Sequence, residues 1–347
     1  MPTGLNLMSL LLLCSLLFLG SAILTGLFRW VAPRVRLIAV PVPRSAHSRP
    51  VPVGGGVSIV VLILLVIAYC YSTDQIPANE FAALMAAAVI ACIGIVDDIK
   101  QLDVRWRIPA QFLASAYVVY CLGNVPAIDF GFFYFPESIL LNVLAIFALV
   151  WLLNLYNFMD GIDGIAATEL IAVNLVSLLI VINSDAVLTL LSASFAAAAG
   201  GFLLWNWAPA KIFMGDVGSS FIGFTLGVMA LLSILHGSMT VWTWVLLLGV
   251  FIVDATLTLF VRYRSKQRWY DGHASHAYQN AARHYKSHAK VTITVVLINF
   301  FWLGPLAWLS MQHPKMGLAI TVMGLIPLLL LAKRFGAGRE NFSLYAQ

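Results

Sequence analysis

Long apolar stretches constrain this chain more than any other feature of its sequence. Of the 347 residues, 61% are hydrophobic and only 10% are charged, whereas a soluble domain carries about 25% charged residues. A helix that crosses a bilayer needs roughly 20 mainly apolar residues. Eleven stretches approach that length: 5–28, 54–72, 78–96, 108–124, 138–153, 164–183, 185–204, 217–236, 240–260, 291–311 and 315–332. The sequence therefore predicts an all-α, polytopic membrane helical bundle of about 11 transmembrane helices, forming a single domain over residues 1–347.

The basic residues indicate the direction in which the chain crosses the membrane. If the eleven stretches alternate, nineteen of the 20 Lys and Arg residues fall on one side and only Lys315 falls on the other. Loops rich in Lys and Arg stay cytoplasmic, so that side is predicted to be cytoplasmic, with an external amino terminus. The net charge of +5 follows from this topology and from anionic membrane lipid, so it does not indicate nucleic acid as a partner.

Acidic and amide side chains gather on the same predicted side. They end the third stretch, follow the fifth and precede the eighth: Asp97, Asp98, Asn154, Asn157, Asp160, Asp163 and Asp216. Adjacent carboxylates at a membrane boundary become tolerable when a cation or a bound proton relieves their repulsion, and Mg²⁺ prefers such oxygen ligands. A helix end reaching water, a capped turn and a helix cap are the structural alternatives. The one-sided gathering favours an active site formed by cytoplasmic loops.

Two further loops on this side carry candidates for binding an anion. In the first, Arg49 precedes a glycine-rich helix start at Gly55, where arginine and backbone amides suit a phosphate, although the Gly-Lys-Ser/Thr of a P-loop is missing. In the second, His273 and His276 follow a basic run, and they are too few for a zinc site without carboxylates. The alternatives are a loop marked by helix breakers and solvated loop histidines, the latter favoured for His284 and His288.

Taken in order, these segments resemble a known family. They read Pro-x-Gly-Gly, Gly-x-x-Asp-Asp, Asn-x-x-Asn-x-x-Asp-Gly-x-Asp-Gly, Phe-Met-Gly-Asp-x-Gly-Ser and a late His-x-x-His, between about residues 44 and 276. The series is similar to the polyprenyl-phosphate N-acetylhexosamine-1-phosphate transferases (glycosyltransferase family 4), which are related to phospho-N-acetylmuramoyl-pentapeptide transferase. The Arg-Ser-x-His start and the Asp-Gly-His-x-Ser-His loop most resemble the branch that initiates O-antigen and related surface glycans.

The resemblance implies a function and a role for each candidate residue. The implied reaction moves N-acetylhexosamine 1-phosphate, or a deoxy derivative, from a UDP-sugar to undecaprenyl phosphate and releases UMP at a bacterial inner membrane. Mg²⁺ is the implied cofactor, and Mn²⁺ is expected to substitute for it. The implied roles are catalytic for Asp97, Asp98, His273 and His276, substrate-binding for Arg49, Gly55, Asn154, Asn157, Asp160 and Asp163, and metal-binding for Asp216 and Asp163. The expected partners are undecaprenyl phosphate, UDP-N-acetylhexosamine and membrane lipid. The sequence does not decide between a monomer and a homodimer.

Three other functions remain as alternatives. An intramembrane aspartyl protease would carry Gly-x-Gly-Asp, but the chain has Phe213-Met214-Gly215-Asp216. A CDP-alcohol phosphotransferase would carry Asp-Gly-x-x-Ala-Arg, but Thr168 stands where the arginine would be. A transporter of lipid-linked or anionic substrates would place its ionisable groups near the bilayer midplane. Release of UMP distinguishes the transferase from the transporter and the protease.

Overall fold

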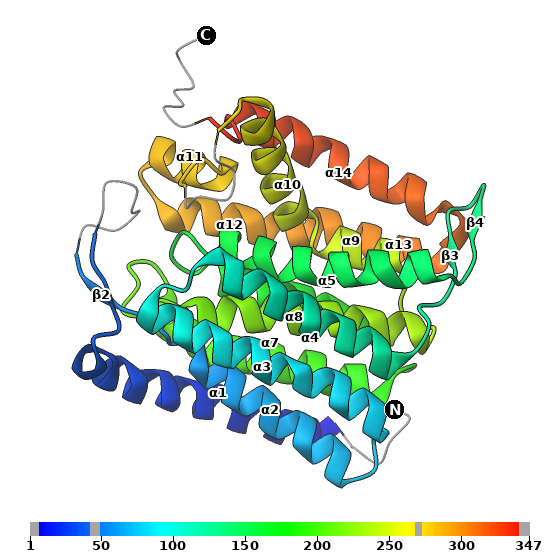
Figure 1. Ribbon diagram of the computed structural model, residues 1–347, viewed down its shortest axis with the longest axis horizontal. Coiled ribbons are helices and arrows are strands. Elements are labelled where there is room, and N and C mark those ends of the chain that lie inside the picture. Colours follow the sequence, from blue (N-terminus) through cyan, green and yellow to red (C-terminus); the bar gives the residue numbers. More distant parts are fainter. Residues whose placement is uncertain (1–6, 42–48, 268–272, 340–347) are drawn as a thin grey trace.

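The structure is a computed structural model that describes residues 7–41, 49–267 and 273–339. Its helices lie side by side in one bundle (Figure 1). Their bounds are α1 Leu7–Val31, α2 Val57–Ser72, α3 Ala78–Lys100, α4 Val104–Leu122, α5 Ile139–Met159, α6 Ile165–Val181, α7 Ala186–Asn206, α8 Asp216–Leu235, α9 Val241–Leu247, α10 Gly249–Arg264, α11 Ala277–Tyr285, α12 His288–Ile298, α13 Gly304–Gln312 and α14 Gly317–Arg334. Short helical turns η1 (Ala32–Val35), η2 (Asn299–Leu303) and η3 (Pro314–Met316) complete the helical elements. The all-α prediction is confirmed.

Two short antiparallel hairpins lie at opposite ends of the bundle. Strands β1 (Ile38–Ala39) and β2 (Val51–Pro52) pair at one end, and strands β3 (Ile128–Asp129) and β4 (Tyr134–Phe135) pair at the other. Figure 1 shows β2 and α11 on the left and β3 and β4 on the right. The left end carries the loops that the charge pattern predicts to be cytoplasmic.

The expected number of spans is not confirmed. Among the described residues, seven helices are long and apolar enough to cross a membrane, and an eighth is added if α9 and α10 form one span with a 78° bend. The predicted stretches 54–72 and 164–183 form helices of only 16 and 17 residues. Most of the stretch 108–124 lies in α4, a helix that carries Arg105 and Arg107 in its first turn and is not among the seven.

Local sequence explains where several helices begin. The side chains of Asp103, Ser138, Asp185 and Ser287 accept hydrogen bonds from backbone N–H groups in the first turns of α4, α5, α7 and α12. Such caps satisfy N–H groups that have no partner within the helix. The residues that precede these helices therefore help to specify where each helix starts.

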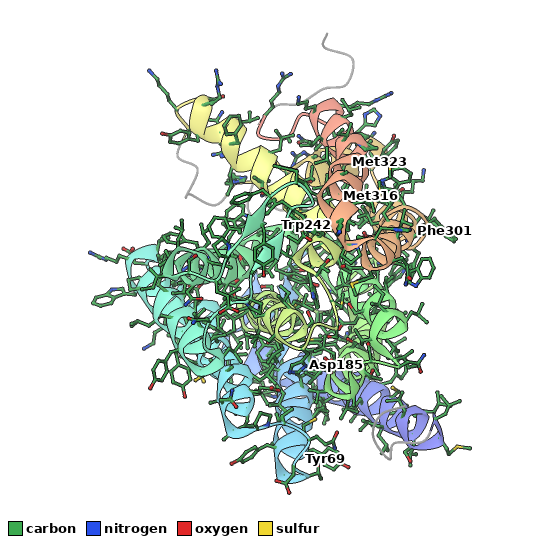
Figure 2. The ribbon with its side chains drawn as sticks, turned by 90° about the vertical axis from the view of Figure 1, so that its right-hand side faces the viewer. Tyr69, Asp185, Trp242, Phe301, Met316 and Met323 are labelled. Atoms are coloured by element: carbon green, nitrogen blue, oxygen red, sulfur yellow. The ribbon has the colours of Figure 1, made fainter. Side chains whose placement is uncertain are left out.

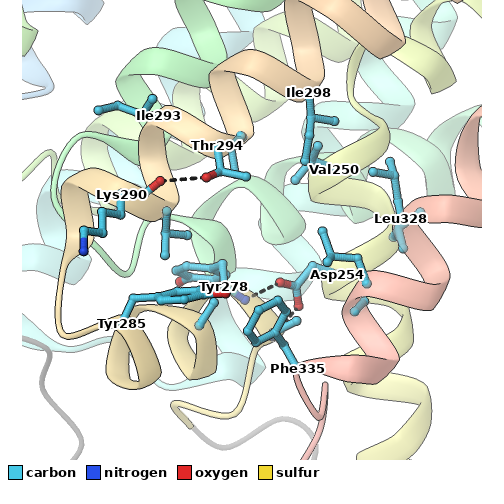
Figure 3. Close-up of a pocket in the computed structure, with 17 residues that line it drawn as sticks. Val250, Asp254, Tyr278, Tyr285, Lys290, Ile293, Thr294, Ile298, Leu328 and Phe335 are labelled. Atoms are coloured by element: carbon cyan, nitrogen blue, oxygen red, sulfur yellow. Dashed lines mark hydrogen bonds between the residues drawn. The ribbon is translucent and has the colours of Figure 1, made fainter. Parts of the chain in front are cut away.

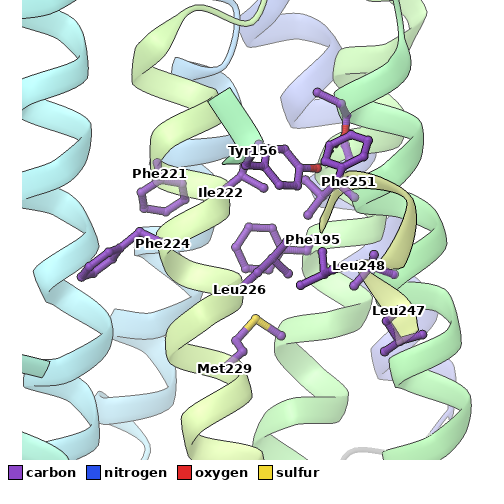
Figure 4. Close-up of a cluster of buried hydrophobic side chains, with 14 of the residues drawn as sticks. Tyr156, Phe195, Phe221, Ile222, Phe224, Leu226, Met229, Leu247, Leu248 and Phe251 are labelled. Atoms are coloured by element: carbon purple, nitrogen blue, oxygen red, sulfur yellow. Dashed lines mark hydrogen bonds between the residues drawn. The ribbon is translucent and has the colours of Figure 1, made fainter. Parts of the chain in front are cut away.

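The core lies where α5, α7, α8 and α10 meet. Phe195, Phe221 and Phe251 are fully buried there, and the ring of Tyr156 lies 5.1 Å from that of Phe251 (Figure 4). A Cβ at Gly223 would lie 2.8 Å from the backbone of α5, so α8 packs closely against that helix, as small residues allow in membrane bundles.

The periphery of the bundle is apolar instead of polar. Phe301 is 77% exposed and Met323 is 47% exposed, and Figure 2 shows both side chains at the edge of the bundle, whereas Asp185 lies among the helices. Exposed apolar surface on this scale marks contact with a membrane. The chain is therefore a multi-pass membrane protein.

Candidate active site

A polar cavity of about 350 Å³ opens where the helix ends meet at the α11 end of the bundle. It is lined by Ala39, Val53, Asp98, Asn157, Asp160, Gly161, Ile162, Asp163, Asn206, Phe213, Gly215, Asp216, Ser219, His273, Ala274, Gln279 and His288. These residues come from the ends of α3 and α5, the start of α8 and the segments beside α11 and α12. The structure thus brings together most of the residues that the sequence selected.

Asp98 joins α3 to the start of α8. Its Oδ1 accepts a hydrogen bond from the backbone N–H of Asp216 at 2.9 Å, and its Oδ2 accepts one from that of Val217 at 3.1 Å. Gly215 precedes these two residues with a φ of +78°, a conformation that glycine adopts without strain. Asp98 therefore lines the cavity and also caps α8, a structural role that the sequence did not reveal.

Asp216 faces the cavity from the first turn of α8. Its Oδ1 accepts a hydrogen bond from Asn157 Nδ2 at 2.9 Å, and Asn157 also contacts the Ser219 hydroxyl at 3.0 Å. Its Oδ2 lies 3.4 Å from Arg107 Nη1. An amide and a guanidinium thus orient the carboxylate that was predicted to bind the metal.

Arg107 is a site residue that the sequence analysis missed. Its Nη1 forms an ion pair with Asp97 Oδ2 as well as with Asp216, so it bridges the two carboxylates. In sequence it counts only as one of the basic residues of the predicted cytoplasmic side. Its position at the start of α4, directly after Asp97-Asp98, was the signal available.

Asp97 and Asn154 lie beside the main cavity and do not line it. Asp97 also accepts a hydrogen bond from Leu102 N at 2.6 Å, and Asn154 donates to Gln111 Oε1 at 2.7 Å. Both residues line a separate cavity of about 30 Å³ with Arg107 and Asn157. This small cavity is next to the polar cavity because Asn157 and Asp216 line both.

Asp160 and Asp163 enter the cavity from the turn between α5 and α6. Burial raises the pKa of the Asp160 carboxyl well above its ordinary value, and neighbouring carboxylates, Asp216 first, raise it further. Asp163 Oδ2 accepts a hydrogen bond from Ala210 N at 3.1 Å and lies 3.2 Å from His288 Nδ1. The carboxylates that line the cavity therefore outnumber the basic side chains that line it.

The donor set fits a hard divalent cation. Asp98, Asp160, Asp163 and Asp216 share one cavity, and the side chains that line it with them include no Lys or Arg. Within the described parts of the chain, no three His, Cys, Asp or Glu side chains form a ready-made metal cluster. Mg²⁺ needs no such cluster, because it commonly binds through one or two carboxylates plus waters and substrate phosphates.

The two predicted catalytic histidines occupy different environments. His273 lines the cavity, and its ring stacks on that of His276 with centroids 4.9 Å apart. His276 is 1% exposed. It caps α11, and its Nδ1 lies 3.3 Å from Asp254 Oδ1. Of these two histidines, only His273 is therefore placed to contact a ligand in the cavity. His276 is buried and packs against the His273 ring.

His288 was expected to be a solvated loop histidine, and this expectation is wrong. Its side chain is 20% exposed, lines the cavity and contacts Asp163. The contact joins residues that are 125 positions apart in sequence, so only folding reveals it.

Asp254 holds α11 in place. Its carboxylate accepts hydrogen bonds from Ala277 N at 2.9 Å and Tyr278 N at 2.8 Å, as Figure 3 shows for the second. On that side of α11 lies an apolar groove of about 500 Å³ between α10, α12 and α14, with Lys290 among its lining residues (Figure 3). Gln279, from the same helix, lines the polar cavity. Helix α11 therefore separates the groove from the cavity.

Arg49 and Gly55 do not line the polar cavity. Arg49 lines a second pocket beside α1. Gly55 packs against Phe202, where a Cβ would lie 2.8 Å from the ring, and its N–H donates to Phe213 O at 2.9 Å. Gly55 thus serves close packing, while residues 44–48 and 271–272 of the two predicted loops lie outside the described residues.

Asp185 anchors a second cluster of ionisable side chains at the opposite end of the bundle. It is 6% exposed, and its Oδ2 lies 2.8 Å from His236 Nδ1, while His236 Nε2 lies 3.0 Å from Glu80 Oε1. Hydrogen bonds to Asp185 and then to Glu80 raise the pKa of His236 to about 10. This cluster ties α3, α7 and α8 together.

Fold and site together define a class: a multi-pass membrane protein with a carboxylate-lined polar cavity at one end of its helices. The sequence matches the model of glycosyl transferase family 4 over residues 80–234, so the resemblance that the motifs indicated is confirmed over this part of the chain.

Relatives of the chain carry more specific names. The chain is 26% identical, over 94% of its length and 92% of the relative, to a probable undecaprenyl-phosphate N-acetylglucosaminyl 1-phosphate transferase of Bacillus subtilis. It is 29% identical, over 82% and 77%, to a decaprenyl-phosphate N-acetylglucosaminephosphotransferase of Mycobacterium tuberculosis. It is 27% identical, over 66% and 74%, to a phospho-N-acetylmuramoyl-pentapeptide-transferase of a Wolbachia strain.

Proposed function

We propose that this protein transfers N-acetylhexosamine 1-phosphate from a UDP-sugar to undecaprenyl phosphate at the cytoplasmic face of a bacterial inner membrane. The observation that carries the proposal is the cavity that gathers Asp98, Asp160, Asp163 and Asp216 at one end of the bundle. The names of the relatives support the same general reaction. The basic residues that gather on one side support a cytoplasmic position for this end.

The reaction is a displacement at phosphorus. An oxygen of the lipid phosphate attacks the phosphorus that carries the sugar, the bond from that phosphorus to the bridging oxygen breaks, and UMP leaves with that oxygen. The lipid phosphate is largely ionised near pH 7, because the second pKa of a phosphate monoester is about 6. The carboxylates are therefore needed less as bases than to position a cation and the anionic groups.

Mg²⁺ is the proposed cofactor, held by Asp216 with Asp163 as the second candidate. When bound, it would neutralise the two anionic substrates and the developing charge on UMP. Asp98 holds the start of α8, which carries Asp216, through two backbone hydrogen bonds. Arg107 orients the same carboxylate through an ion pair with Asp216, and Asp97 holds Arg107 through a second ion pair. His273 and His288 are placed to donate hydrogen bonds to phosphate oxygens.

The arrangement argues against the alternative functions. A transporter would place its ionisable groups near the middle of the bilayer, but the cavity acids lie at helix ends. An aspartyl protease needs two carboxyl groups that share a proton. Here both oxygens of Asp98 accept backbone N–H groups, so they are engaged in capping α8.

We also propose that the product initiates an O-antigen-type surface glycan. The support is the resemblance of the Arg44–His47 and Asp271–His276 segments to that branch. All of the first segment and residues 271–272 of the second lie outside the described residues. The test is a panel of UDP-N-acetylhexosamines and deoxy derivatives, incubated with undecaprenyl phosphate and the reconstituted protein. Turnover of one of these donors with a lipid-diphosphate-sugar product supports the proposal. Turnover of only the peptide-bearing muramoyl donor contradicts the assignment to this branch.

A further inference from the structure

A second polar pocket lies beside the catalytic cavity at the same end of the bundle. Its volume is about 480 Å³, and it is lined by Gly26, Arg29, Trp30, Pro33, Arg49, Pro50, Val51, Pro52, Ala210 and Lys211. These residues come from the last turns of α1, the segment around β2 and the loop before α8. Figure 1 shows the end of α1 near β2 at the left of the bundle. No residue lines both this pocket and the catalytic cavity.

Three cations converge on this pocket. Arg29, Arg49 and Lys211 all line it, and within the described parts of the chain none of the three forms an ion pair with a carboxylate. The Arg29 guanidinium lies 5.4 Å and Lys211 Nζ lies 5.6 Å from the Trp205 ring centroid. Trp205 is itself held by a hydrogen bond to Ala22 O at 2.8 Å. The pocket therefore presents positive charge, and the anchored Trp205 ring holds two of its three cations in place.

The pocket lies at the level of the lipid headgroups. Arg29 is in the last turn of the spanning helix α1, and its neighbour Trp30 is 67% exposed. Trp residues and cations at the ends of spans occupy the membrane–water interface. Gly26, Pro33 and Val51 add apolar lining next to the charges, which suits a ligand with both an anionic group and a hydrocarbon part.

The backbone of the segments around Pro52 and Ala210–Phe213 forms a wall between this pocket and the carboxylates. Phe213 N donates to Pro52 O at 2.9 Å, and Ala210 N donates to Asp163 Oδ2 at 3.1 Å. An acceptor lipid must bring its phosphate to the carboxylate side of this wall to react. A ligand in the second pocket therefore stays apart from the reaction but lies against the loop that positions Asp163.

We propose that this pocket binds the phosphate headgroup of an anionic phospholipid. Basic pockets between spans on the cytoplasmic side bind such headgroups, and guanidinium groups suit phosphate oxygens. A free phosphate shares the charge chemistry but gains nothing from the apolar lining. The inference concerns a membrane lipid that stays bound, so it does not depend on the proposed transferase reaction.

Native mass spectrometry of the purified, delipidated full chain tests this site. The protein is titrated with phosphatidylglycerol and, separately, with phosphatidylcholine of the same acyl chains. Arg29→Gln, Arg49→Gln and Lys211→Gln are each expected to weaken phosphatidylglycerol binding about fivefold, since a cation near an anionic surface contributes about that factor. Binding of phosphatidylcholine should not change. The matched controls are Arg264→Gln, Lys333→Gln and Arg334→Gln, which remove exposed cations from the last turns of α10 and α14.

Three further arms make each outcome decisive. Arg29→Lys and Arg49→Lys should restore most of the binding because they restore the charge, which separates lost charge from misfolding. Equal losses in the pocket and control variants would overturn the proposal, since they would indicate a general effect of surface charge. Displacement of the lipid by inorganic phosphate would assign the pocket to free phosphate. Loss of undecaprenyl phosphate binding alone in the same variants would assign it to the acceptor.

Discussion

Replacing Gly94 by alanine perturbs the site without touching any charged group. Helices α3 and α8 cross in backbone contact at this position. A Cβ at residue 94 would lie 2.6 Å from Val217 Cα and 2.7 Å from Asp216 O. Carbon atoms prefer separations of about 3.5 Å or more. Gly94→Ala must therefore move the start of α8 away from α3 by on the order of 1 Å.

That displacement acts on the two hydrogen bonds that Asp98 makes to α8, at 2.9 and 3.1 Å. Overpacking of this kind costs about 1–3 kcal/mol of stability. A 1 Å misplacement of a catalytic group costs about 100-fold in rate. Gly94→Ala is therefore expected to lower UMP release about 100-fold while the protein still folds.

The assay is UMP release by purified protein in lipid nanodiscs, together with thermal unfolding of the same samples. The matched control is Gly20→Ala in α1, where the added Cβ would lie 3.6 Å from Leu62, an ordinary contact. Turnover of Gly94→Ala equal to that of Gly20→Ala would refute the reasoning, because the close crossing of α3 and α8 would then not position the site.

Three other predictions follow from the same geometry. Chelation of divalent cations should abolish UMP release and Mg²⁺ or Mn²⁺ should restore it; full turnover in excess chelator would remove the proposed metal role. His273→Ala and His288→Ala should each lower kcat about 10- to 100-fold through loss of a hydrogen bond to a charged group, whereas His284→Ala should stay near wild type. Equal, mild effects of these three variants and of His276→Ala would contradict a position of His273 and His288 next to the substrate phosphates. Replacement of His236 by alanine should cost on the order of 2 kcal/mol near pH 7, since its side chain is 29% exposed and its ion pairs are partly screened. Because its folded pKa of about 10 exceeds the unfolded value near 6.5, this stabilisation is complete below about pH 6.5 and is lost as the pH rises towards 10. Thermal unfolding of both proteins at pH 6, 8 and 10 measures this stabilisation. Equal pH profiles for wild type and variant would argue against ion pairs of His236 with Asp185 and Glu80.

The sequence was sufficient to predict the fold class and that several carboxylates gather at one end of the bundle. Long apolar stretches and one-sided basic residues dominate the choice of architecture. They do not fix the number of spans, because the bend after Leu247 and helices as short as 16 residues obey packing constraints that composition does not record.

The partners of the site residues were harder to predict because they come from distant parts of the chain. Adjacent in sequence, Asp97 and Asp98 point to different partners, Arg107 in one case and the α8 backbone in the other. Asp185 precedes the apolar stretch of α7 with no local sign of a partner, yet it is buried and forms an ion pair with His236. Tertiary contact, and not local pattern, decides each of these roles.

The most direct test of the central claim is to identify the nucleotide that leaves. Purified protein, undecaprenyl phosphate, Mg²⁺ and a UDP-N-acetylhexosamine are combined, and both the nucleotide and the lipid product are analysed. The account predicts UMP in equal amount to undecaprenyl-diphosphate-sugar, only when both substrates are present, and no product from Asp216→Asn. Release of UDP would mean that the sugar moves without its phosphate. That result, or full activity in the Asp216 variant, would contradict the account.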